Sequence, residues 1–223
     1  MDDLAIAVYS CDKNDEVWPV FSHCINKYWE NHPKVYFLTE TKKTPFFNTI
    51  SLNYDLDHWT NRIKESLKLI EEKYVIFLSD DIFINEKVNI KKLIECINIL
   101  KNDIYSGIQF ELSWHENDQD CKYDGFKYKA HNSLYRLSFL CGIWKKEDLI
   151  DILKTDMNLW YAEMIKDYKN EFLQVCNEKV ISWFNDGYGG NGAIRCGKWQ
   201  HGVEEFLKSE GLTVDFSKKG FKE

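Results

Sequence analysis

The sequence predicts an α/β protein with a mostly parallel central sheet flanked by helices. Strand-like apolar runs alternate with helix-like periodic segments through the first half of the chain. One apolar run, residues 74–78, leads into two adjacent carboxylates, Asp80 and Asp81, and open α/β sheets bind their ligands beyond such strand ends. The 223 residues, 44% of them hydrophobic, suffice for one sizeable core and are few for two. We therefore expect a single domain over residues 1–223.

The first half, residues 1–112, is the more regular part of this prediction, because its apolar stretches keep a clear strand or helix periodicity. Asp15 and Asn89 precede two of the helical stretches and are the expected N-caps. Strands are expected at residues 4–10, 35–38, 49–52 and 75–78. Helices are expected after Asp15, with an apolar stripe at Trp18, Phe21, Ile25 and Tyr28, then over residues 59–72, and from residue 90 to 97.

The second half, residues 113–223, is expected to form a smaller, irregular region. Six of the eleven glycines fall between Gly187 and Gly202, so this backbone must take unusual dihedral angles or approach another group closely. A loop that closes on a ligand and a set of tight turns explain it equally well. The spacing matches neither GxGxxG nor the P-loop pattern. Strands are expected at residues 104–112, 135–144 and 180–184, helices at 145–153 and 159–168, and a polar surface loop at 114–125.

Composition excludes several classes of protein. A net charge of −7 and a pI near 5.5 argue against a nucleic-acid groove, which needs clustered Lys and Arg. The seven cysteines include no CxxC pair, so we expect free thiols rather than a zinc cluster or a disulfide framework. We expect no signal peptide, and the sequence contains no run of ~18 apolar residues. We expect a cytoplasmic protein without a transmembrane segment; association with a membrane surface stays open.

The pair Asp80 and Asp81 is the strongest functional signal. Adjacent carboxylates repel each other, and a nearby cation is the usual reason for such a pair. Mg²⁺ or Mn²⁺ is commonly held by one or two carboxylates while the phosphates of a substrate complete its shell. The pair therefore indicates a phosphorylated ligand held through a metal. A simple capping role in the following turn is the alternative.

Three blocks of sequence, taken in order, resemble small bacterial and viral GT-A fold glycosyltransferases that use nucleotide sugars, of the type found in capsule and surface-glycan clusters. The resemblance covers nearly the whole chain and rests on the joint order of the blocks, since no single block is specific. In the second block, Ser79, Asp80 and Asp81 resemble the DxD metal motif of that fold. The blocks are residues 6–13 with the aromatic helix to 29, residues 59–62 with 74–81, and residues 142–146 with 158–163 and 188–199.

The resemblance implies donor-binding and metal-binding roles. Asp81 would bind Mn²⁺ or Mg²⁺ directly, and Asp80 would hold the donor's ribose or sugar or reach the metal through water. Arg62 would lie near the donor's sugar or phosphates, with a helix-surface position paired with Glu65 or solvent as the alternative. His201 is the candidate third ligand, although a lone histidine is more often packed or on the surface. The other donor-side positions are Ser10, Asp12, Lys13 and Ser79, and the poorer metal candidates are His131 and Asp186.

The resemblance also implies an acceptor side. Glu163 occupies the place where inverting members carry an acidic general base at the start of a helix. The aromatic side chains of Trp144, Trp160, Tyr161 and Tyr188 are candidate platforms for acceptor sugars, and core packing is the alternative for each of them.

Together these expectations describe a hexosyltransferase that moves a hexose from a nucleotide sugar, with UDP favoured, to a glycan or lipid-linked acceptor. An inverting displacement with Glu163 as base is preferred, and retention stays open. A sugar-phosphate nucleotidyltransferase is the first alternative, but it would need a basic, glycine-rich loop where residues 11–15 are acidic. A non-catalytic carbohydrate-binding protein on the same fold is the second.

Overall fold

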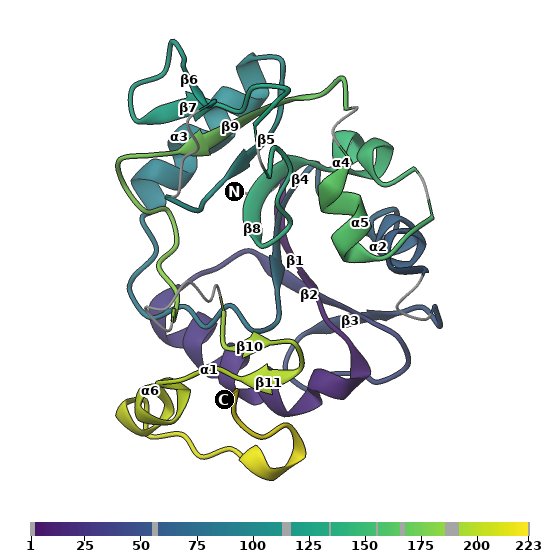
Figure 1. The fold of residues 1–223 in the computed structure, drawn as a ribbon, viewed down its shortest axis with the longest axis vertical. Helices are drawn as coiled ribbons and strands as arrows, with labels where there is room; N and C mark the ends of the chain where they lie inside the picture. Colours follow the sequence, from purple (N-terminus) through teal and green to yellow (C-terminus); the bar gives the residue numbers. More distant parts are fainter. Residues whose placement is uncertain are drawn as a thin grey trace.

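A nine-stranded sheet with helices on both faces forms the centre of the protein (Figure 1). The computed structural model describes residues 3–54, 58–112, 117–133, 135–154, 156–165, 168–185 and 192–222. The strand order in the large sheet is β3-β2-β1-β4-β8-β5-β9-β7-β6, and β10 and β11 form a separate pair.

The bounds of the elements follow the chain. The strands are β1 (Leu4–Tyr9), β2 (Lys34–Thr39), β3 (Asn48–Ser51), β4 (Tyr74–Ser79), β5 (Tyr105–Gln109), β6 (Gln119–Asp120), β7 (Phe126–Tyr128), β8 (Cys141–Lys145), β9 (Glu171–Val175), β10 (Ile194–Arg195) and β11 (Lys198–Trp199). The helices are η1 (Asp12–Val17), α1 (Trp18–Tyr28), α2 (Trp59–Leu67), α3 (Ile90–Asn102), α4 (Lys146–Ile152), α5 (Leu159–Met164), α6 (Val203–Ser209) and η3 (Phe216–Lys218).

Strand direction confirms the predicted mostly parallel sheet. Strands β3, β2, β1 and β4 are parallel neighbours. Strand β8 lies antiparallel between β4 and β5, so β5 again runs parallel to β4, and β9 follows β5 in the same direction. The carboxyl ends of β1, β2, β4 and β5 therefore meet at one edge of the sheet, where ligands of open α/β folds bind.

Alternating side chains divide the core into two layers. In β1, Ile6 and Val8 face the layer formed with α1, α3 and α6, whereas Ala5 and Ala7 face the layer formed with α2, α4 and α5. This is the period of two expected when both faces of a sheet are covered. Figure 1 shows α2, α4 and α5 together on one side of the sheet.

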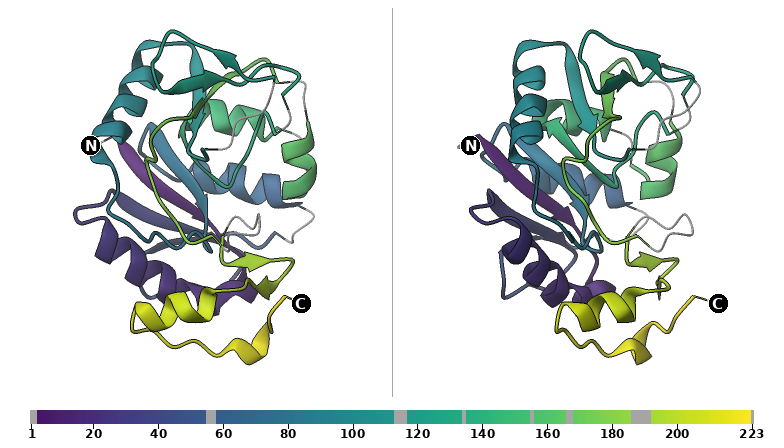
Figure 2. Two further views of the ribbon diagram at one scale, coloured as in Figure 1. Left: turned by 60° about the vertical axis from the view of Figure 1, so that its left-hand side comes forward. Right: turned by 90° about the vertical axis from the view of Figure 1, so that its left-hand side faces the viewer.

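The carboxyl-terminal segment packs against α1 through one buried acid. Glu210, just after α6, accepts hydrogen bonds from Lys27 Nζ at 2.7 Å and Tyr28 Oη at 2.6 Å, and lies 3.0 Å from His23 Nε2. Figure 2 shows the resulting arrangement, with the yellow segment alongside the purple helix. These contacts hold the end of α6 against α1, and α6 follows β10 and β11 in the chain.

The expected cap of the first helix is wrong, whereas that of the third is confirmed. Helix α1 begins at Trp18 with Val17 as its N-cap, and the 3-10 helix η1, which contains Asp15, precedes it. Asp15 does not cap α1 because its carboxylate accepts a hydrogen bond from Lys42 Nζ at 2.6 Å. The side chain of Asn89 accepts from the backbone N–H of Lys92 at 3.1 Å, as a capping residue does.

The second half departs further from the prediction. Residues 180–184 do not form a strand, since only a single bridge joins Trp183 to Ile84. Strand β8 covers the end of the stretch expected at 135–144, and the expected loop at 114–125 contains β6. Strand β9 was not expected, because its Glu-Phe-Leu-Gln-Val sequence is short and mixes polar and apolar residues. Within the described residues, no helix is long and apolar enough to cross a membrane.

Candidate functional site

Strand β4 carries Asp80 and Asp81 to the carboxyl edge of the sheet, between β1 and β8. The backbone N–H of Asp80 donates to Tyr9 O at 3.2 Å, which joins this turn to the end of β1. The two residues are 1% and 6% exposed. Burial, followed by the charge of Asp81, raises the pKa of Asp80 to about 7, and burial also raises the pKa of Asp81. A divalent cation beside the pair would relieve both effects.

The connection from β1 to α1 fixes the carboxylate of Asp80. The hydroxyl of Ser10 donates to Asp80 Oδ2 at 2.5 Å, and the amide of Asn14 donates to Oδ1 at 3.2 Å. Trp18 Nε1 in turn donates to Ser10 Oγ at 2.7 Å. Both oxygens of Asp80 therefore have protein donors, so its orientation is set by residues that are close to it in space and far from it in sequence.

The carboxyl-terminal segment fixes Asp81. The backbone N–H of Ile194 donates to Asp81 Oδ2 at 3.0 Å, and the N–H of Ala193 donates to the carbonyl oxygen of Asp81 at 3.0 Å. A hydrogen bond from Ser79 also favours the ionised carboxylate, although burial outweighs it and the pKa rises. The described part of the glycine-rich segment thus consists of tight turns and the β10–β11 pair packed against the candidate metal ligand.

Arg62 is buried and holds the loops after β1 and β2 together. Its Nη2 donates to Ser10 O at 2.8 Å, and its Nη1 donates to the carboxylate of Glu40. Glu40 also accepts from the backbone N–H of Asp12. The alternative of a surface pair between Arg62 and Glu65 is wrong, since Glu65 pairs with Lys68 at 2.7 Å.

A cavity of about 200 Å³ lies beside Asp80 and is lined by several of the predicted residues. Its wall includes Ser10, Arg62, Ser79 and Asp80, which the sequence prediction assigned to the donor. Trp160 from α5 lines the same cavity and is 69% exposed. Trp160 therefore lies with the donor-side residues rather than apart from them on the acceptor side.

The loop after β1 also faces a second cavity, of about 630 Å³, that Asp12 and Lys13 line. The carboxylate of Asp12 accepts from the backbone N–H groups of Thr41 and Lys42 at 3.0–3.1 Å. Partial burial opposes ionisation of Asp12, but hydrogen bonds from the Thr41 hydroxyl and from these N–H groups outweigh it and keep the pKa of Asp12 below its usual value. Asp12 thus already holds the loop after β2. The carbonyl oxygen of Lys13 accepts from Lys219 Nζ at 2.7 Å.

Glu163 lies on α5, the helix that also carries Trp160. Its Oε1 accepts a hydrogen bond from the backbone N–H of Phe139 at 2.7 Å. Burial, with a contribution from Glu111, raises the pKa of Glu163 to about 7. Burial and then the charges of Glu163 and Asp81 raise the pKa of Tyr9 well above its usual value, so the two carboxylates share this phenol as a neighbour.

Other predicted residues do not join this group. Trp144 is wrong as an acceptor platform: β8 alternation places it, fully buried, in the core layer under α2, α4 and α5. Tyr161 is 62% exposed on α5 and lines none of the cavities described above. Tyr188 lies outside the described residues.

Within the described residues, the arrangement of side chains gives no support to the predicted third metal ligand. His201 is exposed in the turn before α6, and within the described ranges no three His, Cys, Asp or Glu side chains are grouped as a metal site. His131 Nε2 lies 3.6 Å from Oε1 of Glu171, on β9. Asp186 lies outside the described residues.

Three residues of this region were missed. Glu40 and Glu111 each follow a strand of the sheet, as Asp80 does, so the strand-end argument applied to Asp80 would have found them. Asn14 offered no such signal, because it reads as an ordinary turn residue.

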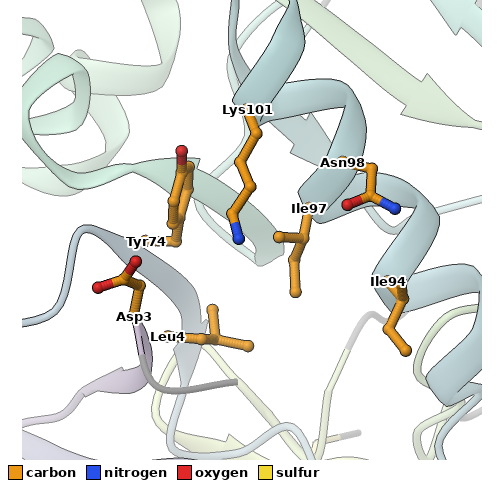
Figure 3. Close-up of a pocket in the computed structure, with 7 residues that line it drawn as sticks. All are labelled: Asp3, Leu4, Tyr74, Ile94, Ile97, Asn98 and Lys101. Carbon is orange, nitrogen blue, oxygen red and sulfur yellow. The ribbon is translucent and has the colours of Figure 1, made fainter.

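A further cavity, of about 370 Å³, lies at the opposite end of the sheet (Figure 3). The amino-terminal ends of β1 and β4 supply Leu4 and Tyr74, and α3 supplies Ile97 and Lys101. In Figure 3 the Lys101 chain extends between Tyr74 and Ile97. None of the predicted site residues lines this cavity.

No protein-family model and no curated protein sequence matches this chain. Among solved structures, S. aureus TarS 1-349 matches with a TM-score of 0.51 and 11% identity over 80% of this chain and 59% of that one. A longer TarS chain matches with a TM-score of 0.51 and 11% identity over 82% of this chain and 37% of that one. A cytidylyltransferase from Leptospira borgpetersenii serovar Hardjo-bovis matches with a TM-score of 0.48 and 10% identity over 81% of this chain and 78% of that one. This chain thus spans less than two thirds of either TarS chain, and the likeness establishes a shared fold alone.

Proposed function

We propose that this protein is a metal-dependent glycosyltransferase that moves a hexose from a nucleotide sugar, preferably UDP-linked, to a glycan or lipid-linked acceptor. The observation that carries the proposal is the buried pair of Asp80 and Asp81 at the carboxyl edge of the sheet, next to a cavity that Arg62 and Trp160 line. Such a pair is costly without a cation, and a cation at this edge fits a ligand that carries phosphates.

The donor set of the pair fits Mn²⁺ or Mg²⁺, which prefer carboxylate oxygens. Asp81 would hold the ion, and Asp80, fixed by Ser10 and Asn14, would orient the donor or a metal-bound water. The metal would stabilise the negative charge that develops on the departing nucleoside diphosphate.

The 200 Å³ cavity supplies groups suited to the donor. Trp160 presents an exposed indole on which a base or a sugar ring can stack. The Nε of Arg62 is buried and has no hydrogen-bond partner within the described chain. A buried donor of this kind is costly when unpaired, and an oxygen of the nucleotide sugar would satisfy it.

Glu163 would act as the general base of an inverting displacement. A base works best when its pKa lies near the working pH, and burial brings this carboxyl to about 7. The hydrogen bond from Phe139 holds one oxygen of Glu163, which leaves the other to accept the proton of an acceptor hydroxyl. This role is compatible with Tyr9 being a neighbour of both Glu163 and Asp81.

A nucleotidyltransferase is the second candidate, and one observation favours it. Lys13, Lys42, Lys218 and Lys219 line the 630 Å³ cavity beside the loop after β1, where a triphosphate would need positive charge. Lys42 and Lys219 are however paired with Asp15 at 2.6 Å and Glu16 at 3.2 Å. The cavity is therefore less basic than its lysine content indicates.

A ligand panel separates the two candidates. Nucleotide sugars with Mn²⁺, and nucleoside triphosphate with sugar phosphate, are compared by their effect on thermal unfolding. A ligand at ~100 times its dissociation constant adds about 2.7 kcal/mol to the free energy of unfolding. We expect one UDP-hexose to stabilise the protein and to be slowly hydrolysed. Stabilisation by triphosphate and sugar phosphate alone would replace the glycosyltransferase proposal with the nucleotidyltransferase.

A further inference from the structure

A cavity of about 240 Å³ lies at the carboxyl end of β5. In the sheet, β4 and β8 lie between β5 and β1, and the end of β1 lines the 200 Å³ cavity, called here the donor-side cavity. Phe110 and Glu111 line it from the end of β5, and Lys179, Ser182, Trp183 and Asn185 line it from the segment that leads from β9 towards β10. All these residues lie within the described chain, and none belongs to the donor-side cavity.

This cavity is joined directly to the turn that carries the aspartates. Trp183 forms a β-bridge with Ile84, and the backbone N–H of Asn85 donates to Ser182 O at 3.1 Å. The N–H of Phe184 donates to Phe83 O at 2.9 Å. These two hydrogen bonds make up the bridge, and they tie the wall of the cavity to residues 83–85, two to four residues after Asp81.

The cavity is also joined to Glu163. Residues 138 and 139 connect Glu111, which lines the cavity, to Glu163. Ser138 forms a hydrogen bond with Glu111, and the backbone N–H of Phe139 donates to Glu163 Oε1 at 2.7 Å. Glu111 and Glu163 are close enough for the charge of the first to act on the second. The cavity therefore lies beside both the aspartate turn and the proposed base.

The lining chemistry suits a neutral polyol with an apolar face. Trp183 and Phe110 supply aromatic surface, and sugar rings present a face of C–H groups to such surfaces. Glu111 offers carboxylate oxygens, Asn185 an amide, Ser182 a hydroxyl and Lys179 an ammonium group. Donors and acceptors of both kinds around an aromatic wall match the alternating hydroxyls of a sugar better than they match an anion or a hydrocarbon chain.

We propose that this cavity binds one pyranose ring, the terminal sugar of a glycan acceptor, with Trp183 against the ring and Glu111 on its hydroxyls. This inference rests on the proposed function for the transfer step only. In that step the acceptor hydroxyl gives its proton to Glu163 and its oxygen bonds to C1 of the donor hexose. The bond from C1 to the diphosphate breaks, and its electron pair leaves on the nucleoside diphosphate.

Saturation-transfer NMR on the full chain tests the site with defined probes. The probes are the methyl glycosides of glucose, galactose, mannose and N-acetylglucosamine, each without donor or metal. We expect at least one to receive saturation, and Glu111→Gln and Trp183→Ala each to reduce the signal about fivefold or more. Lys101→Ala, in the cavity of Figure 3, is the matched control and should leave the signal unchanged.

Three outcomes decide the proposal. No saturation of any glycoside, or equal signals in Glu111→Gln and the unmodified protein, overturns it, and so does loss of the signal in Lys101→Ala alone. Should Trp183→Ala fail to fold, Trp183→Phe keeps an aromatic wall of smaller area and should weaken the signal without abolishing it. Because the probes are tested without donor, failure here is separate from failure of the ligand panel that tests the transferase itself.

Discussion

Gly192 packs directly against the carboxylate of Asp81. A Cβ atom at position 192 would lie 2.6 Å from Asp81 Oδ2, and the φ of +104° at this glycine is one that other residues rarely adopt. Two residues later, Ile194 N–H donates to the same oxygen. The carboxyl-terminal segment therefore shapes the surroundings of a proposed metal ligand that β4 supplies.

Gly192→Ala should weaken metal-dependent binding of a nucleoside diphosphate. The added methyl group would displace the carboxylate of Asp81, and a tenfold loss of affinity corresponds to about 1.4 kcal/mol. Calorimetry with UDP and Mn²⁺ measures it. The matched control is Gly197→Ala, which has a similarly unfavourable φ of +74° but no atom of the described residues within 4 Å of the added Cβ. Equal losses in both variants would mean that backbone strain, rather than contact with Asp81, is responsible.

Glu163→Gln should leave donor binding nearly intact and slow transfer by about 10²- to 10⁴-fold, the usual contribution of a positioned base. The amide keeps the size of the side chain and can still accept the hydrogen bond from Phe139. Transfer is measured as release of nucleoside diphosphate in the presence of acceptor. Glu147→Gln, on the exposed side of α4, is the control and should retain activity. If Glu163→Gln remains as active as Glu147→Gln, Glu163 is not the general base.

Transfer should depend on pH through Glu163. Its folded-state pKa is raised to about 7, and only the deprotonated carboxylate accepts a proton. The rate should therefore fall as pH drops below about 7 and level off above it. The residual rate of Glu163→Gln should lack this dependence. A profile that is flat from about pH 5.5 to pH 8, or one that Glu163→Gln shares, would contradict the assignment.

Gly107→Ala should destabilise the fold without involving the site. A Cβ at position 107 on β5 would overlap the indole of Trp144 on the neighbouring β8, which packs across the glycine. Overpacking of this kind costs about 1–3 kcal/mol of unfolding free energy. Urea denaturation measures it. The double variant Gly107→Ala with Trp144→Leu should be less destabilised than the sum of the two single changes, and simple additivity would show that the two positions do not interact.

The sequence predicted the first half of the fold well because its apolar periodicity matches the two core layers. In α2, Trp59, Ile63 and Leu67 recur at helical spacing and all lie in one layer. The second half was predicted less well for a physical reason. Strand β9 is held by its neighbours β5 and β7, so its local composition carried little signal.

The candidate site shows the same division. Asp80 and Asp81 could be singled out from the sequence because they directly follow an apolar strand, which is a local pattern. The pairing of Arg62 with Glu40 and the contact of Gly192 with Asp81 depend on how distant segments meet. The burial of Trp144 depends on which face of β8 it occupies, and the sequence around it left that open.

Calorimetric titration of UDP tests the central claim most directly, because the claim requires a metal held by Asp81. The account predicts measurable binding with Mn²⁺, loss of binding in EDTA, and loss of binding in Asp81→Ala with Mn²⁺ present. Asp151→Ala, an exposed acid on α4, should bind as the unmodified protein does. Equal affinity for UDP with and without EDTA, or in Asp81→Ala, would contradict the metal assignment and the glycosyltransferase proposal built on it.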